Sequence, residues 1–389
     1  MREGWRRVTL GEILRLRSER THSVDTLLSV TADRGVIRQS ESGRRDSSSA
    51  DKSLYWDVHP GDVVYNTMRM WQGVSGVAGE TGIVSPAYTV CEPVGGVSSD
   101  FLRWLLKEPG LVGKFFNRSQ GLVSDTWNLK YSEFKKIEVN LPTLAEQHRI
   151  VEVLDEVDAQ MQAVEATEKK DSVSLLAAMA NRLSSPEHPR CSLKELLNGR
   201  PRNGFSPTEV DGWTGFLVLG LGCLTPTGFV PRQLKSVSSD VASGHSATLS
   251  DGDLLVSRAN TRELVGLAGT YRNVGAPCLY PDLMMRLTPK PGVSAEFLEI
   301  IFALPEVRRR IQALSQGTSD SMVKITGDVV WNLEVPIPGS EEINRLLLVR
   351  EAALRRLKVH VHTKEKLLRE KKALMDDLLN GKVRVLSGN

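Results

Sequence analysis

Cysteine and histidine are sparse in this chain, and they are scattered. The four cysteines form no C-x-x-C pair and have no histidine at ligand spacing; they are Cys91, Cys191, Cys223 and Cys278. This pattern excludes the common zinc motifs and predicts reduced, mostly buried thiols in a reducing compartment. His360 and His362 lie two residues apart, so on a helix they would point in different directions. We therefore expect no metal and no cofactor.

Long apolar runs are missing as well. No run reaches the ~18–20 residues that a membrane span needs. The first seven residues lead into a mixed polar segment without the apolar stretch of a signal peptide. Together these absences predict a cytoplasmic location. The net charge of +3 permits nucleic-acid binding without predicting it, because a basic patch can be hidden in a balanced total.

Catalytic motifs are not found in complete form. Ser85–Tyr88 resembles the Asn/Asp-Pro-Pro-Tyr loop of amino-methyltransferases but lacks the initial Asn or Asp and the second proline. Gly220–Gly222 is followed by Thr225 instead of the third glycine of a dinucleotide loop, and Gly110–Lys114 is too short for a phosphate-binding loop. No Glu-x-Lys follows Asp282 as a nuclease motif would require. We expect the chain to catalyse nothing by itself.

The two halves of the sequence are similar to each other. An offset of 196 residues superimposes the two halves without a gap from residue 101 to 149, and the matches include Phe101-Leu102 with Phe297-Leu298, and Gln120-Gly121 with Gln316-Gly317. Upstream the offset becomes 191, where Gly61–Val64 matches Gly252–Leu255, and then 183, where Leu10 and Glu12 match Leu193 and Glu195. Such drift is expected where insertions lie in loops between framework elements. We infer an internal duplication.

The first part of each repeat, 1–142 and 186–339, is rich in Gly, Ser, Thr and Val and contains short alternating runs such as 62–66 and 253–257. These runs are typical of strands between turns. One helix is predicted in each part, near 99–116 and 294–315. The pattern predicts two α+β domains, each built around a twisted, mainly antiparallel sheet.

The second part of each repeat, 143–185 and 340–382, predicts a long helix, and 383–389 forms a tail. Apolar residues recur at spacings of three and four; those expected to pair the helices are Ile150, Leu154, Val157, Met161, Val164, Leu347, Leu354, Leu357, Val361 and Leu368. About 40 residues would form a rod roughly 60 Å long, suited to a coiled coil.

Charge indicates how these two helices pair. Residues 143–185 hold four Lys/Arg against eight Asp/Glu, a balance of −4, whereas 340–382 hold eleven against seven, a balance of +4. Opposite charges favour mixed pairing over self-pairing. We expect an antiparallel coiled coil within one chain, which would place the two domains at opposite ends. Solvated helix faces or homodimerisation remain the alternatives.

Two similar but divergent domains held apart by a rod suit a protein that recognises two separated half-sites on DNA. Domains at a fixed spacing can address major-groove faces about one turn, roughly 34–36 Å, apart. Because the domains differ, the target would be asymmetric and bipartite.

Several segments resemble a known family. Pro142–Asp155 looks like the opening of the central helix of Type I restriction-modification specificity subunits, and Gly61–Gly73 with Gly82–Tyr88 resembles their first target-recognition domain. In the second half, Gly252–Thr261 and Gly317–Pro338 look like the same framework. The resemblance implies a non-catalytic subunit that binds double-stranded DNA. Its implied partners are two methyltransferase (modification) subunits, docked by the helices, and a restriction/translocase subunit, with no membrane involved.

Candidate DNA-contacting residues lie in loop-like stretches that mix basic, amide and aromatic side chains. They are Arg69, Trp71, Gln72, Tyr88 and Lys130 in the first half, and Arg258, Asn260, Arg262, Tyr280 and Lys324 in the second. Arg can bridge guanine and Asn or Gln can bridge adenine, while Lys more often meets phosphate. The structural alternative is that the aromatic residues fill core space and that any one Arg is only solvated.

Two other functions are compatible with the sequence. One is a DNA methyltransferase-like enzyme with an unrecognised active site, which saturable binding of S-adenosylmethionine would favour. The other is a coiled-coil scaffold that does not bind DNA, which absent or salt-independent binding would favour.

Overall fold

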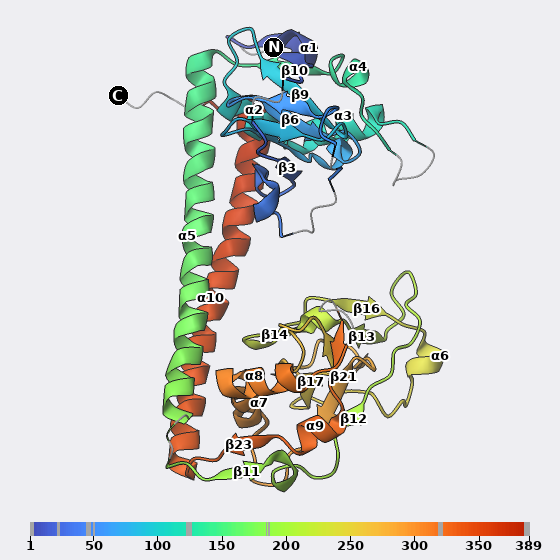
Figure 1. Ribbon diagram of the computed structural model, residues 1–389, viewed down its shortest axis with the longest axis vertical. Helices are drawn as coiled ribbons and strands as arrows, with labels where there is room; N and C mark the ends of the chain where they lie inside the picture. Colours follow the sequence, from blue (N-terminus) through green and yellow to red (C-terminus); the bar gives the residue numbers. More distant parts are fainter. Residues whose placement is uncertain are drawn as a thin grey trace. The chain divides into compact units, whose positions relative to one another are not determined.

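A computed structural model describes residues 4–21, 24–43, 48–49, 51–121, 127–183, 185, 187–317 and 322–384. The end of the expected tail, 385–389, lies outside these residues. The chain divides into two compact units, one of residues 1–164 with 363–389 and the other of residues 165–362. Each unit therefore contains one globular part and a stretch of both long helices (Figure 1).

The long helices are α5 (Leu144–Leu183) and α10 (Ser340–Leu379). The strands of the first unit are β1 (Arg6–Thr9), β2 (Leu14–Arg17), β3 (Leu28–Thr31), β4 (Gly35–Arg38), β5 (Trp56–Val58), β6 (Val63–Asn66), β7 (Ser75–Val77), β8 (Gly82–Val84), β9 (Tyr88–Pro93) and β10 (Glu138–Leu141). Its shorter helices are α1 (Leu10–Ile13), α2 (Ser99–Leu105), α3 (Pro109–Arg118) and α4 (Tyr131–Phe134), with the 3-10 turns η1 (Gln39–Glu41) and η2 (Met70–Gln72).

The strands of the second unit are β11 (Arg190–Ser192), β12 (Arg202–Asn203), β13 (Leu217–Leu219), β14 (Leu224–Thr225), β15 (Gly228–Phe229), β16 (Leu234–Ser236), β17 (Leu254–Ser257), β18 (Ala259–Asn260), β19 (Ala268–Thr270), β20 (Cys278–Leu279), β21 (Met284–Leu287), β22 (Val323–Lys324) and β23 (Glu334–Pro336). Its shorter helices are α6 (Ser239–Ala242), α7 (Ala295–Ala303), α8 (Pro305–Leu314) and α9 (Gly327–Trp331), with the 3-10 turns η4 (Leu193–Glu195) and η5 (Leu221–Cys223).

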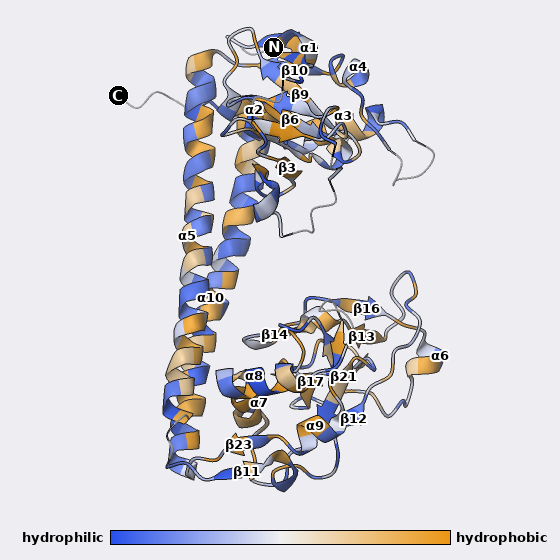
Figure 2. Ribbon diagram, in the orientation of Figure 1, coloured by the Kyte–Doolittle hydropathy of each residue, from blue (hydrophilic) through white to orange (hydrophobic). Residues whose placement is uncertain are grey.

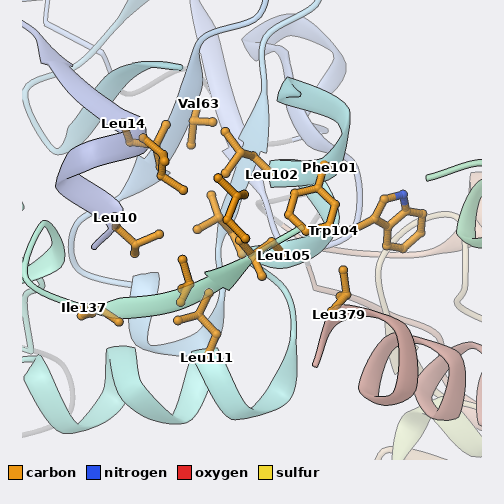
Figure 3. Close-up of a cluster of buried hydrophobic side chains, with 14 of the residues drawn as sticks. Leu10, Leu14, Val63, Phe101, Leu102, Trp104, Leu105, Leu111, Ile137 and Leu379 are labelled. Atoms are coloured by element: carbon orange, nitrogen blue, oxygen red, sulfur yellow. The ribbon is translucent and has the colours of Figure 1, made fainter. Parts of the chain in front are cut away.

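The predicted α+β class with mainly antiparallel sheets is confirmed. The central sheet has the order β2-β9-β6-β7 in the first unit and β12-β21-β17-β19 in the second, and every pairing in both is antiparallel. A parallel exception is the pairing of β13 with β20. Helices α2 and α7 contact strands of these sheets. The first core, part of which Figure 3 draws, lies between the sheet, α2 and the long helices.

The duplication reaches down to individual local motifs. The side chain of Glu12 accepts the backbone N–H of Thr9 at the start of α1, and Glu195 accepts that of Ser192 at η4 in the same way. Such capping boxes satisfy N–H groups that a helix start leaves without partners. The offset of 183 predicted this equivalence of Glu12 and Glu195.

The repeated Gly-Asp pair before β6 and β17 also has a local cause. Gly61 and Gly252 adopt φ values of 89° and 91°, in the left-handed region that favours glycine. The carboxylate of Asp62 accepts the backbone N–H of His59 at 2.8 Å, and that of Asp253 accepts the N–H of Ser250 at 2.9 Å. Glycine and aspartate together therefore close the turn that leads into each central strand.

The prediction of a single helix near 99–116 and near 294–315 is wrong, because each of these stretches forms two helices. The first breaks between α2 and α3, where Pro109 begins the second helix, and the other breaks between α7 and α8 at Pro305. A residue that precedes proline is disfavoured in the helical region, and Glu108 and Leu304 accordingly adopt extended backbone.

Helices α5 and α10 contact each other in an antiparallel sense within each unit. In the first unit Lys371 donates a hydrogen bond to Asp158 at 2.5 Å. In the second, the ring of His360 lies 3.0 Å from Asp171, and Arg182 donates to Glu342 at 3.1 Å. As residue numbers rise along α5 they fall along α10. Figure 2 shows apolar and polar residues interspersed along both helices.

Most of the predicted pairing positions are at least partly buried. Those that are buried or half-buried are Ile150, Leu154, Val157, Met161, Val164, Leu347, Leu354 and Leu357. The prediction is wrong for Val361 and Leu368, which are 43% and 44% exposed. In their place the half-buried His360 and the buried Leu367, each one residue earlier, lie in the seam of α10, and Leu346 is more buried than its neighbour Leu347. Adjacent leucines fit either register, and a half-buried histidine takes the place expected for Val361.

Each globular part is tied to a long helix by an ion pair of opposite polarity. In the first, Arg103 on α2 donates to both carboxylate oxygens of Asp155 on α5, at 2.7 and 2.9 Å. In the second, Glu299 on α7 accepts from Arg350 on α10. The offset of 196 makes Arg103 and Glu299 equivalent positions. Base and acid have therefore exchanged sides between the repeats.

Candidate nucleic-acid interface

The loop after β6 carries the first group of predicted contacts. Met70 in η2 is fully buried and fixes the turn to the core, while Arg69 and Gln72 on either side are exposed. Gly73, with φ of 76°, ends the turn. Because one buried side chain anchors the turn, its polar neighbours are displayed outward.

A second segment joins this loop through the backbone. The N–H of Leu129 donates to the carbonyl of Thr67 at 2.9 Å, and Gln120 and Asn128 exchange backbone hydrogen bonds at 3.1 and 2.8 Å. Lys130, which follows Leu129, is exposed. The structure thus brings Lys130 to the loop that carries Arg69, as the sequence suggested.

Aromatic side chains gather where these segments meet. Trp71 lies edge-on to Phe116 and Trp127, with ring centroids 6.2 and 5.2 Å away, and Phe116 lies 4.8 Å from Trp127. Trp71 and Trp127 are half-buried, and Phe116 is 46% exposed. Trp71 therefore belongs to a surface cluster. Sequence reasoning missed Phe116 and Trp127; a phenylalanine on the polar face of α3 was the available signal for the former.

Tyr88 lies at the same end of the central sheet. It pairs with Asn66 between β9 and β6, and its hydroxyl is 3.3 Å from that of Ser29. The side chain is half-buried, so it contributes packing as well as surface.

The second half repeats this construction. The N–H of Ile325 donates to the carbonyl of Arg258 at 2.9 Å, in the place of the bond between Leu129 and Thr67. Strand β18 pairs with β22, which sets Ala259 opposite Lys324 and leaves the Lys324 side chain exposed. Arg258, Asn260 and Lys324 are thereby brought together.

Several of these side chains are oriented by neighbours. Arg258 donates to the carbonyl of Asp282 at 3.2 Å, and the side-chain oxygen of Asn260 accepts the N–H of Thr261 at 2.8 Å. Arg262 donates to the carbonyl of Gln312 and the hydroxyl of Ser315, both at 3.2 Å. All three are half-buried. Arg262 thus also ties its loop to the end of α8.

The prediction that Tyr280 contacts DNA at the surface is wrong. Only 1% of it is exposed, and its hydroxyl donates to the carbonyl of Arg202 at 3.3 Å. The sequence placed it beside the loop, whereas the strand pairing turns it into the core.

Arg308 supports the second loop from α8. Its guanidinium donates to the carbonyls of Val265 at 2.6 Å and Glu263 at 2.5 Å. Burial lowers the pKa of Arg308 from its ordinary value. Arg308 thus holds the loop that follows Arg262.

The chemistry of both loops suits contact with nucleic acid. Within the described residues, no three His, Cys, Asp or Glu side chains gather as metal ligands. Among the same residues, no helix is apolar over a length that would cross a bilayer. Exposed cations, amides and aromatic rings are the groups that contact phosphates and base edges.

The comparisons with known proteins agree with this interpretation. Residues 111–173 match the family model described as Type I restriction modification DNA specificity domain. The chain is 25% identical over 272 residues to the Type I restriction enzyme EcoKI specificity subunit of Escherichia coli (strain K12), which covers 65% of this chain and 58% of that protein. The matched region thus spans less than two thirds of the curated relative.

A solved structure supports the same fold. It belongs to work on the structural basis of complex assembly and conformational transition of the type I R-M system, and it covers 98% of this chain and 99% of its own with a TM-score of 0.58 and 16% identity. That likeness concerns the fold. The family model and the curated relative are both of specificity subunits of Type I restriction-modification systems, so the chain is similar to that family in sequence over part of its length.

Proposed function

We propose that this chain is the sequence-reading subunit of a Type I restriction-modification complex. Residues 1–142 and 186–339 act as two target-recognition domains, each reading one half of an asymmetric, bipartite DNA target. The helical segments 143–185 and 340–382 serve as the spacer and dock the modification subunits. Its partners are double-stranded DNA, two modification subunits and a restriction/translocase subunit, and such a complex works in the cytoplasm.

One observation carries this proposal. The same loop is built twice on the same strand of a duplicated sheet, with the equivalent backbone bonds Leu129 to Thr67 and Ile325 to Arg258. The side chains displayed there differ, as Arg69 is replaced by Asn260 and Trp71 by Arg262 under the offset of 191. A repeated frame with divergent contacts suits the reading of two unlike half-sites.

Exchange of one globular part tests the proposal. Residues 1–142 are replaced by the corresponding part of another specificity subunit, and methylated positions are mapped in the host genome with and without each chain. We expect one half of the target to change while the other is kept. Exchange of residues 186–339 is the matched control and should change the opposite half. An unchanged target in both exchanges would contradict the proposal.

The chain itself is proposed to be non-catalytic. The isolated chain should show neither saturable binding of S-adenosylmethionine nor methyl transfer to DNA. The same preparation should support methylation once modification subunits are added, which controls for its folding. Saturable binding by the chain alone would favour an enzyme instead.

A further inference from the structure

The surface cluster of Trp71, Phe116 and Trp127 is not needed to fill the core. Phe116 is 46% exposed, and the nearby Met68 is 45% exposed. The rings hold each other edge-on, with interplanar angles of 66° to 86°. The result is a fixed apolar patch at the end of the central sheet, beside the exposed Arg69 and Gln72.

The patch offers apolar contact more than hydrogen bonds. The indole N–H of Trp71 is already used, because it donates to the carbonyl of Met68 at 3.0 Å. Phe116 and Met68 have no donor in their side chains, and the indole N–H of Trp127 is the one further donor among these four residues. A polar base edge placed against Phe116 or Met68 would lose its water without gaining a partner, which is unfavourable.

The second globular part has no such patch at the equivalent positions. The offset of 191 puts Arg262 in the place of Trp71, and the offset of 196 puts Gln312 in the place of Phe116 and Val323 in that of Trp127. Arg262 donates to the carbonyl of Gln312, and Val323 is fully buried. The apolar character is therefore particular to the first half.

The major groove presents one apolar group, the C5-methyl of thymine. We propose that the patch of Trp71, Phe116, Trp127 and Met68 contacts a thymine methyl in the half-site read by the first globular part. This inference rests on the proposed function and makes it more specific. The first half-site then contains at least one T·A pair recognised by its methyl group, next to pairs contacted by Arg69 and Gln72.

Deoxyuridine lacks only that methyl group, so it provides the probe. The full chain, assembled with its modification subunits, is titrated with duplexes that carry the mapped target. Thymines are replaced by deoxyuridine in one half-site, in the other, or in neither. We expect replacement in one half-site alone to weaken binding about three- to ten-fold, the size expected for one buried methyl group.

Variants connect that loss to the patch. In Trp71→Ala and Phe116→Ala, the thymine duplex should bind as weakly as the deoxyuridine duplex does to the unaltered chain, and the methyl preference should vanish. Trp71→Phe keeps an apolar ring and should keep most of the preference. Trp213→Ala removes an aromatic side chain that is 70% exposed in the second unit, and should leave the preference unchanged.

The outcomes separate this inference from the proposed function. Equal binding of thymine and deoxyuridine duplexes in both half-sites would overturn the methyl contact while leaving specific binding intact. Weaker assembly of Phe116→Ala with the modification subunits, with the methyl preference kept in the complex that does form, would instead make the patch a protein-docking surface. Failure of the unaltered complex to prefer its mapped target at all would sink the proposed function itself.

Discussion

Glu299 is a buried acidic residue of the second unit, and it pairs with a long helix. Its side chain accepts from the N–H and hydroxyl of Thr270, at 2.8 and 2.7 Å, and from Arg350 on α10. Only 5% of the residue is exposed. A charge in such a place is tolerated because its partners replace the lost water.

Removal of this carboxylate should be costly. Glu299→Ala leaves the Arg350 guanidinium poorly solvated and unpaired, and we expect a loss of about 3–5 kcal/mol in the free energy of unfolding. Urea denaturation of the full chain, monitored by a signal from the second unit, measures this loss. Glu351→Ala, in an exposed pair with Arg355 on the same helix, is the control and should leave the midpoint unchanged. Similar midpoints for both variants would contradict the assignment.

The thiol of Cys278 offers a test by pH. Burial raises its pKa to about 12. An exposed thiol is largely ionised by about pH 9, so the unfolded chain loses this proton first. The corresponding stability is present below pH 9 and is lost as pH rises toward 12.

At pH 9 we therefore expect iodoacetamide to alkylate Cys278 far more slowly in the folded chain than in urea. Peptide mass spectrometry reads the two rates. Cys191, which is half-buried, should react faster in the folded chain and serves as the internal comparison. Equal rates at the two positions would show that Cys278 is accessible.

Among single residues, the sequence predicted loop position better than side-chain direction. Arg69 and Lys130 do lie on segments that the backbone bond between Leu129 and Thr67 joins, and the offset between the repeats located the framework on both sides of these segments. The position of Tyr280 was wrong because the whole run from Cys278 to Tyr280 is buried, so no exposed face alternates with a buried one there. The partners of Trp71 were missed because they come from α3 and from the segment after residue 126, which only tertiary contacts bring together.

At the level of elements, the seam between α5 and α10 mixes apolar and charged pairs. Lys371 donates to Asp158, and its ammonium group also lies 4.6 Å from the ring centre of Trp104. The side chains of Lys371 and Asp158 are 20% and 31% exposed, so solvent screens them only in part. Such pairs set the register and direction of a coiled coil.

Reversal of one charge should be repaired by reversal of the other. Asp158→Lys places two cations together and should lower stability, whereas Asp158→Lys with Lys371→Asp should recover much of the loss. A coupling energy of about 1 kcal/mol is expected for a partly buried pair. A double-mutant cycle from denaturation midpoints measures it. Additive effects of the two substitutions would mean that the pair contributes nothing.

The elements themselves were largely predictable, since helical spacing indicated both long helices and opposite net charge indicated their mixed pairing. The antiparallel direction was expected from the placement of the two globular parts, because charge did not fix it. The register of α10 was not, because runs such as Leu346–Leu348 satisfy more than one heptad frame. The helix breaks before Pro109 and Pro305 could have been found from the proline rule alone.

For the whole molecule, DNA affinity should depend strongly on salt. Phosphate contacts release counterions, so the logarithm of affinity should fall linearly with the logarithm of salt concentration. If Lys130 and Lys324 contact phosphate, Lys130→Ala and Lys324→Ala should each reduce that slope by about 1 and weaken all sequences equally. Arg258→Ala should instead cost about 1–3 kcal/mol at one base pair. Fluorescence anisotropy at several salt concentrations distinguishes the two behaviours.

The opposite polarity of the two anchoring ion pairs limits how such chains can be recombined. A globular part moved from the first position to the second would bring the arginine of α2 against Arg350, and the reverse transfer would bring Glu299 against Asp155. Exchange of globular parts should thus be tolerated best between corresponding positions of different chains. Transposition within one chain would need a compensating substitution on the receiving helix.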